Sequence, residues 1–494
     1  MVEPAFILFR TAYKKIKMKL INKESLCLCL LIILLIGLSC ISCSSTENTP
    51  SDNQIKPYLQ NPGYWQYKGE PVLLLGGTDD DNLFQMAELE QHLNELKEAG
   101  GNYIRNTMSF RDSGNVSPFL LLENGNYDLD AWSEDFWNRF ETLLKLTHER
   151  DIIVQIEVWD RFDYSQEFWE NNPFNPVNNI NYTLSDTIFD EHYPKHPSGD
   201  LQPFFHTIPG MPLYNPRLDR IRDLQEKYID KMLSYSLDFG NVLYCMNNET
   251  TTPVEWGNHW IDYIRSKAKA RGTEVYLTDM YDHFYRVNSC EKCKELIAKP
   301  EYYTFMDISQ INSRNFGQAH WDTLQVILDK RDQYTLRPVN HTKIYGGDNR
   351  SFGSGSNADG VERFCRNVIG GCASARHHRP PTGNGLNEKA KGTIKATRKV
   401  ENLVKFWEVE PQMHLLADRE PNEAYLTCKE GEKYIIYFPK GGNVKLDLSK
   451  YQKKFTARWI NIETGEWGES SSMEGGSFRE ISAPDMSGWY VVIK

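Results

Sequence analysis

The sequence predicts an α/β protein: a TIM-type (β/α)8 barrel followed by a small C-terminal β-sandwich. Strand-like and helix-like segments alternate about eight times between residues 57 and 412. After Pro411 the helical spacing stops, and short strands separated by glycine-containing turns fill residues 413–494. No glycine-rich dinucleotide loop follows the first strand, so a doubly wound sheet is the less favoured alternative.

Each element is predicted from the spacing of its apolar residues. The segment from Tyr64 to Pro71 is typical of a hairpin that leads into the buried strand VLLLGG at 72–77. Further strands are predicted at 102–110, 152–159, 242–246, 274–277, 302–308 and 337–345, with an eighth after Gly370-Gly371. Helices are predicted at 85–99, 133–150, 218–239, 255–271, 320–333, 359–369 and 387–409.

The N-terminal region predicts export to the cell envelope. An apolar run from Leu26 to Leu38 follows several lysines and is typical of a secretory signal. The cysteines behind it resemble a bacterial lipobox, in which Cys43 would carry the lipid and Cys40 is the alternative. Residues 1–43 are therefore a predicted lipoprotein signal, and the polar residues 44–56 are a predicted tether. A cleaved signal without a lipid remains open.

Composition excludes several classes of protein. With 67 acidic and 56 basic residues the net charge is −11, which argues against a nucleic-acid partner. The 40% of hydrophobic residues exclude a mainly disordered chain. A mean hydropathy of −0.57 leaves a lipid anchor as the expected contact with a membrane. We expect no cofactor and no metal. The lone pair Cys290 and Cys293 lacks the second pair of a zinc site and fits a local disulfide equally well.

The active site of such a barrel lies at the carboxyl ends of its strands. The side chains predicted there are carboxylates, amides, aromatic rings and a few cations, a set that suits sugar hydroxyls. The candidate substrate-binding residues are Asn248, Asp79, Arg105, Trp159, Asp160, Asp282, Lys343, His377 and His378. The long segment 162–216 is predicted to form a lid, with further sugar contacts at Tyr164, Trp169, Phe204, Phe205 and His206.

The fourth strand ends in Asn248-Glu249. This resembles the strand-four pattern of a large clan of retaining (β/α)8 glycoside hydrolases, and the resemblance implies that Glu249 is the general acid/base and that Asn248 binds a sugar hydroxyl. A carboxylic acid with a raised pKa can protonate a leaving alkoxide at neutral pH. The alternative is an ordinary pair that caps the next helix.

The whole chain also resembles bacterial extracellular proteins in which an apiosidase-like barrel is joined to a β-domain named "putative collagen-binding". The resemblance spans residues 57–494 and rests on KGEPVLLLGGT, GNYIR, the NNE strand end, GGCA and YIIYFPKGGNVKLDLSKYQ with ARWINIETGEW. It implies a glycoside hydrolase with a carbohydrate substrate. Nothing in these residues indicates collagen binding, and the β-domain is as readily a structural support.

Strand seven departs from the clan pattern. Lys343 stands where the nucleophilic Glu would be expected, and Asp348 is the nearest carboxylate. Asp348 could be the nucleophile or base, which makes it a candidate catalytic residue. Alternatively, Asp79, Asp282 or Asp307 could complete an inverting pair. The barrel could also have lost hydrolysis and bind a glycan. It could instead act as a polysaccharide lyase with a His or Tyr base and with Lys343 and Arg379 neutralising a uronate.

Overall fold

The computed structural model describes residues 53–197, 202–348 and 350–494, all of which belong to one compact unit. The predicted signal, most of the tether and Cys43 lie outside the described residues. In the part of the chain that is described, no helix is long and apolar enough to cross a membrane. The first elements are the antiparallel strands β1 (Lys56–Tyr58), β2 (Asn61–Tyr67) and β3 (Glu70–Val72), which include the predicted hairpin.

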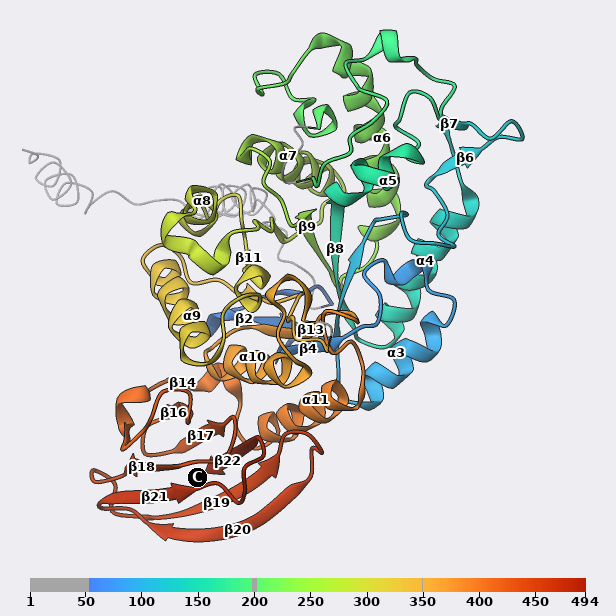
Figure 1. Cartoon of the computed structure of the whole chain (residues 1–494). Coiled ribbons are helices and arrows are strands. Elements are labelled where there is room, and N and C mark those ends of the chain that lie inside the picture. The colour runs from blue at the N-terminus through green and yellow to red at the C-terminus, as the bar shows by residue number, and fades with distance from the viewer. Residues whose placement is uncertain (1–52, 198–201, 349) are drawn as a thin grey trace, which may run out of the picture. The chain divides into compact units, whose positions relative to one another are not determined.

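Buried parallel strands form the centre of a mixed α/β fold (Figure 1). They are β4 (Leu74–Gly77), β5 (Tyr103–Thr107), β8 (Ile153–Asp160), β9 (Val242–Asn248), β10 (Leu277–Thr278), β11 (Met306–Asp307), β12 (Val339–Asn340) and β13 (Ser374–His377). They form three sheets, β5–β8–β9–β10, β11–β12 and β13–β4. The predicted strands are confirmed in order, although β10, β11 and β12 are shorter than their apolar runs suggested.

Backbone hydrogen bonds connect these sheets to one another. The amide of Asn102 donates to the carbonyl of Leu75 at 2.8 Å, that of Thr304 to Leu277 at 2.9 Å, and that of Ala373 to Val339 at 2.9 Å. The strands therefore follow one another in chain order in a barrel-like array, and their carboxyl ends face the same side.

Amphipathic helices follow most of the strands and cover them with their apolar sides. They are α3 (Leu89–Glu98), α4 (Glu134–Glu149), α6 (Asp219–Ser236), α7 (Val254–Ala270), α8 (Glu291–Ala298), α9 (Gly317–Asp332), α10 (Asn357–Ile369) and α11 (Glu388–Glu401). Polar caps start several of them: Asn387, for example, accepts a hydrogen bond from the amide of Ala390 at 3.0 Å. The helix predicted over 387–409 ends early because Asn402 closes α11 and a separate 3-10 turn, η9 (Phe406–Glu408), follows.

The long segment after β8 contains short elements: η2 (Arg161–Tyr164), α5 (Gln166–Glu170), η3 (Leu184–Asp186), η4 (Pro203–His206) and η5 (Pro216–Leu218). Its aromatic residues are part of the main hydrophobic core. Tyr164 and Phe204 stack with ring centroids 3.8 Å apart, and Trp169 is fully buried. Phe205 and His206 are also buried. This burial contradicts the prediction that these five side chains are sugar contacts. Before α4, β6 (Phe119–Leu121) and β7 (Tyr127–Trp132) form a hairpin.

Two antiparallel sheets form the C-terminal region. One contains β14 (Glu410–Pro411), β16 (Tyr425–Lys429), β17 (Lys433–Phe438), β22 (Trp489–Ile493), β19 (Lys454–Asn461) and β20 (Trp467–Glu474). The other contains β15 (Leu416–Ala417), β18 (Asn443–Asp447) and β21 (Phe478–Ser482). Alternating residues of both sheets, such as Ile436 and Val444, share one buried core.

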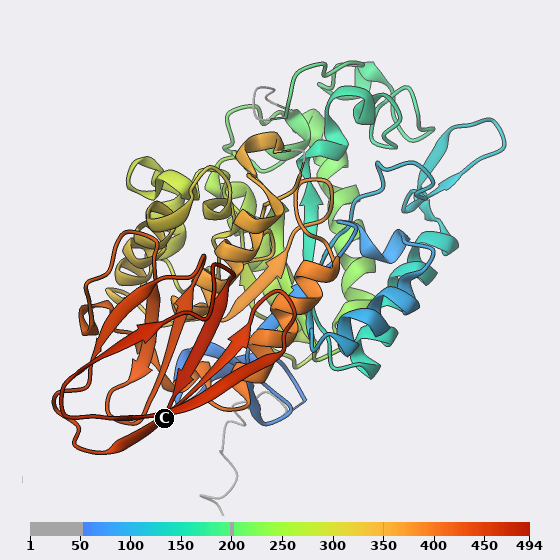
Figure 2. The ribbon, with the colours of Figure 1, turned by 60° about the horizontal axis from the view of Figure 1, so that its bottom comes forward.

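The outer side of the larger sheet packs against α10 and α11 (Figure 2). Tyr437 and Tyr490 of this sheet belong to the main hydrophobic core. Gly392 of α11 lies so close to the β19–β20 turn that a Cβ atom added to it would stand 1.8 Å from the carbonyl oxygen of Glu463. Lys395 of the same helix pairs with Glu466 at 2.6 Å. The C-terminal region thus supports the helices that follow β12 and β13.

Gly392 provides a test of this packing. Replacing a helical glycine by alanine ordinarily stabilises a helix by about 1 kcal/mol. Here we expect Gly392→Ala to lower the free energy of unfolding by about 1–3 kcal/mol, because the added methyl meets the Glu463 carbonyl. Denaturant unfolding measures the change, and an unchanged or increased stability would contradict the described contact.

Candidate active site

Glu249 follows the last residue of β9 and has a left-handed backbone, with φ at 51°. Positive φ is uncommon for residues other than glycine and costs of the order of 1–3 kcal/mol, and it persists where the surroundings fix it. Its side chain is 17% exposed, so it faces a partly open space at the carboxyl end of the strands. Strain at a carboxylate in this place is typical of a functional residue.

Two residues of the segment after β12 hold the Glu249 carboxylate. The Nζ atom of Lys343 lies 2.5 Å from its Oε1 atom, and the hydroxyl of Tyr345 donates to the same oxygen at 2.6 Å. Burial alone would raise the pKa of Glu249. The charges of Lys343 and Arg161 and the hydrogen bonds from Lys343 and Tyr345 outweigh burial and hold this pKa below its ordinary value. Both contacts are to Oε1, and no described residue donates a hydrogen bond to Oε2 of Glu249. Oε2 is therefore available to a water or a substrate.

The direction of this shift is the opposite of the one expected for a general acid. The strand-four resemblance implied a Glu249 that carries its proton at neutral pH, whereas the structure favours the ionised carboxylate. The cause is Lys343, which replaces the expected nucleophile by a cation. An ionised Glu249 suits a base better than an acid.

Asn248 connects Glu249 to the end of β8. It accepts a hydrogen bond from Lys343 through Oδ1, and its Nδ2 donates to Asp160 Oδ2 at 2.7 Å. Asp160 in turn pairs with Arg111, which also reaches Asp163 at 2.9 Å. The predicted residues Asn248, Asp160 and Lys343 are therefore brought together with Glu249.

A second carboxyl group lies at the end of the neighbouring strand β10. Arg161 pairs with Asp282 through Nη2 and Oδ2, 2.7 Å apart, and its Nη1 donates to the Thr251 hydroxyl at 3.2 Å. The side chain of Asp282 is 15% exposed. Burial raises the pKa of Asp282, Arg161 opposes the shift, and the Glu249 charge adds to it. The net direction of the pKa of Asp282 is upward.

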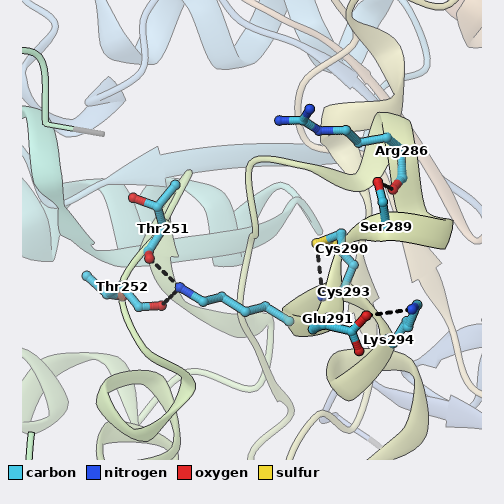
Figure 3. The surroundings of a disulfide bond; sticks show 9 residues. Thr251, Thr252, Arg286, Ser289, Cys290, Glu291, Cys293 and Lys294 are labelled. Carbon is cyan, nitrogen blue, oxygen red and sulfur yellow. Dashed lines mark hydrogen bonds and ion pairs between the residues drawn. A yellow bond between two sulfur atoms is a disulfide. The ribbon is translucent and has the colours of Figure 1, made fainter. Parts of the chain in front are cut away.

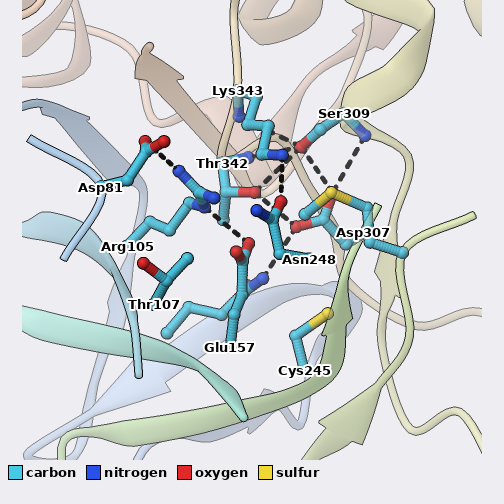
Figure 4. A network of polar contacts seen from close by, with 12 residues as sticks. Asp81, Arg105, Thr107, Glu157, Cys245, Asn248, Asp307, Ser309, Thr342 and Lys343 are labelled. Atoms are coloured by element: carbon cyan, nitrogen blue, oxygen red, sulfur yellow. Dashed lines mark hydrogen bonds and ion pairs between the residues drawn. The ribbon is translucent and has the colours of Figure 1, made fainter. Parts of the chain in front are cut away.

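Buried ion pairs lie beside Asn248 and Lys343 (Figure 4). Arg105 on β5 joins Asp81 and Glu157, with Nε 2.7 Å from Glu157 Oε1. Arg379 also pairs with Asp81, at 2.7 Å. Asp81 and Glu157 compensate the charge of Arg105 within the protein. Arg105, which was predicted to bind substrate, is fully buried and supports this network of ion pairs.

Of His378, Asp79 and Asp348, which were also predicted to be site residues, only His378 lies beside the site residues described above. His378 lies 3.6 Å from Asp81 and places its ring 4.7 Å from that of Tyr345, so it belongs to the site. Asp79 is half exposed and accepts a hydrogen bond from the Leu386 amide at 2.8 Å, away from Glu249. Asp348 is exposed, and no hydrogen bond or ion pair with a described residue links it to Glu249.

The predictions for Trp159 and His377 are corrected by their burial. Trp159 is 2% exposed and contacts the rings of Phe204, Trp256 and Trp260. His377 is fully buried and its ring lies against Phe364 at 4.7 Å, on the helix side of β13. Successive side chains of a strand alternate between its two sides. The ring of His377 therefore points toward the helices, on the side opposite to the side chain of Arg376.

Asp307 is also excluded as a free carboxylate at the mouth. It is fully buried, and it accepts hydrogen bonds from Gln155 at 2.7 Å, from Thr342 at 2.7 Å and from Ser309 at 2.5 Å. Protein side chains thus satisfy the buried carboxylate of Asp307, which is typical of a structural role. Among the described residues, no group of three or more His, Cys, Asp or Glu side chains is placed to hold a metal ion.

Tyr345, Arg161 and Asp81 are site residues that were not among the candidate substrate-binding or catalytic residues. Each lies at or just after the carboxyl end of a predicted strand, so their positions were predicted but their roles were not. Their partners could not be predicted, because each contact joins strands that are far apart in the chain.

Lys343 allows a direct test of the charge balance at Glu249. Lys343→Met removes the cation that pairs with Glu249, so we expect the pKa of Glu249 to rise. The sign follows because burial, which raises this pKa, remains while the largest opposing charge is lost. NMR titration of the Glu249 carboxyl group measures the shift, and Lys343→Arg, which keeps the charge, is the control. An unchanged pKa of Glu249 in Lys343→Met would contradict this description.

Comparisons with solved structures define the class of fold. A glycoside hydrolase family 5 protein from Bacteroides vulgatus superimposes with a TM-score of 0.60 at 12% identity, covering 90% of this chain and 94% of that chain. A second structure, titled "Glycoside hydrolase", gives a TM-score of 0.59 at 12% identity and covers 90% of this chain and 97% of that chain. The chain therefore has the fold of glycoside hydrolases with TIM-barrel-like architecture.

Two family models match parts of the sequence. "Domain of unknown function (DUF6298)" matches residues 108–281, which include β9 and Glu249. "Putative collagen-binding domain of a collagenase" matches residues 410–493, which confirms the predicted resemblance of the C-terminal region. No curated protein matches the chain.

Proposed function

We propose that this protein is a glycoside hydrolase whose strands close a (β/α)8 barrel, with Asp282 as general acid and Glu249 as general base. The observation that carries the proposal is the placement of two carboxyl groups after neighbouring strands, where Lys343 and Tyr345 hold Glu249 and Arg161 pairs with Asp282. The pKa of Glu249 is held below its ordinary value and that of Asp282 above it. Environments that separate two carboxyl groups in this way assign the acid and the base.

The reaction follows from this assignment. Asp282 protonates the leaving glycosidic oxygen, while Oε2 of Glu249 accepts a proton from the water that attacks the anomeric carbon. Lys343 and Tyr345 bind Oε1 and keep Glu249 ionised. With a cation at the strand-seven position, no carboxylate is available there for a covalent intermediate, so a single displacement with inversion is the supported course.

Loss of hydrolysis is the second candidate function, because Lys343 stands in the expected nucleophile position. The protein would then bind a glycan without cleaving it. A lyase has less support. Arg379 and Lys343 are already paired with Asp81 and Glu249, respectively. The pKa of Tyr345 is raised by burial and by the Glu249 charge, which disfavours a tyrosine base.

A glycan panel separates these functions. The full chain is incubated with plant-type and host-type oligo- and polysaccharides, and products are read as new reducing ends, as ultraviolet absorbance of an unsaturated sugar, and as heat of binding. New reducing ends without absorbance support hydrolysis. An absorbing product would mean a lyase, and binding without any product would mean a binding protein.

We also propose that the protein is a lipid-anchored protein of the bacterial cell envelope, as its N-terminal sequence suggests. The disulfide Cys290–Cys293 supports export, because such bonds persist in oxidising compartments. If Cys43 carries the lipid, Cys43→Ser will leave the membrane fraction, and a variant that stays wholly with membranes would refute this assignment.

A further inference from the structure

A half-buried lysine connects the segments that carry the two carboxyl groups of the site. Lys292 lies on α8, which follows Asp282 in the chain through η6 (Phe284–Ser289). Its Nζ atom donates to the carbonyl of Thr251 and, at 2.6 Å, to that of Thr252. These are the second and third residues after Glu249. Lys292 therefore joins the segment after β9 to the segment after β10.

The disulfide Cys290–Cys293 joins residues that flank Lys292 in the sequence (Figure 3). Cys290 and Cys293 are bonded across the first turn of α8, and the Sγ atom of Cys290 accepts a hydrogen bond from the amide of Cys293 at 3.2 Å. A bonded pair on either side of Lys292 fixes the backbone from which its side chain extends. Helices of this length are marginal alone, so the bond contributes directly to the order of this turn.

The backbone at Glu249 requires such support. Its positive φ is unfavourable for a glutamate, and the residues after it must be held for the strain to persist. The amide of Thr250 donates to the carbonyl of Met280 at 2.8 Å, and the amide of Asp282 donates to the carbonyl of Thr250 at 3.2 Å. The ammonium group of Lys292 binds the carbonyls of Thr251 and Thr252. Lys292 thereby adds to the attachment of residues 249–252 to the segment after β10.

We propose that Lys292 is a positioning residue that fixes Glu249 against Asp282, and that the disulfide Cys290–Cys293 keeps Lys292 in place. This inference rests on the proposed function for its effect on turnover. Its effect on the segment 249–252 does not depend on any activity.

The test compares Lys292→Met with Lys294→Met. Lys294 lies on the same helix but pairs with Glu291 at the surface, so it is a matched control. We expect Lys292→Met to lower kcat by about 10–100-fold, because small displacements of catalytic groups cost this much. We expect a smaller change in KM, partial rescue in Lys292→Arg, and wild-type kcat in Lys294→Met.

Hydrogen exchange separates positioning from the chemistry. The amide of Thr250 is expected to exchange about tenfold faster in Lys292→Met and unchanged in Lys294→Met, since exchange reports local opening. Unchanged exchange at Thr250 in Lys292→Met overturns the positioning role whether or not the protein hydrolyses glycans. Failure of the glycan panel with faster exchange refutes the proposed function alone.

Reduction tests the role of the disulfide. A dithiol reagent supplies two electrons and two protons, gives two cysteine thiols and is itself oxidised to a disulfide. The free cysteines among the described residues, Cys245, Cys365, Cys372 and Cys428, are buried. We expect reduction to speed Thr250 exchange in the wild type and to add little in Lys292→Met. Independent, additive effects on exchange would refute the coupling of the disulfide to Lys292.

Discussion

Glu249→Gln is expected to lower kcat by about 10²–10⁴-fold, the range that a positioned acid or base contributes. Glutamine keeps the volume of the side chain and can still accept the hydrogen bonds of Lys343 and Tyr345, but it cannot take a proton from water. Binding of the glycan should remain. Initial rates and calorimetry on the substrate found in the panel measure the two effects separately.

Asp348→Asn is the matched control for this change, because Asp348 is an exposed carboxylate that does not contact Glu249 in the structure. Its kcat should equal that of the wild type. Equal turnover in Glu249→Gln and wild type would remove Glu249 from the chemistry. A large loss in Asp348→Asn would restore Asp348 as the catalytic partner.

Asp282→Asn should show a loss that depends on the leaving group. Natural glycans, whose leaving alkoxides need a proton, should be cleaved about 10²–10⁴-fold more slowly. Aryl glycosides with acidic leaving groups need little protonation and should be cleaved at nearly the wild-type rate. Rates on both substrates distinguish loss of a general acid from a general disturbance of the site.

The pH dependence of activity distinguishes the general acid from the general base. The proposed mechanism requires a protonated Asp282, so activity is expected to fall as pH rises through the raised pKa of that group. The mechanism also requires an ionised Glu249, so activity is expected to fall at the acidic end only below the lowered pKa of Glu249. Asp282→Asn should lose the alkaline limb and keep the acidic one. Retention of the alkaline limb in Asp282→Asn would assign the acid to another group.

Apolar spacing predicted the order of strands and helices because each element buries one side against the same core. It failed where the signal is short. Helix α8 was not predicted, since eight residues with one buried stripe and a disulfide show little periodicity. The lengths of β10, β11 and β12 were overestimated, because a residue such as Phe305 is buried without being part of the sheet ladder.

The candidate site was predicted in part. Asn248, Glu249, Asp282 and Lys343 follow from strand ends, which topology brings to one side. The pKa of Glu249 could not be predicted, since it depends on a contact between residues far apart in sequence. Trp159 and the rings after β8 were misassigned because an aromatic residue near a strand end packs in a core as readily as it binds a sugar.

The anomeric configuration of the first product tests the central assignment most directly. Proton NMR of the reaction in water, recorded before mutarotation on the glycan that the panel identifies, shows which anomer is released. Glu249 as base and Asp282 as acid require the inverted anomer. Release of the retained anomer, or of an unsaturated sugar, would contradict this assignment.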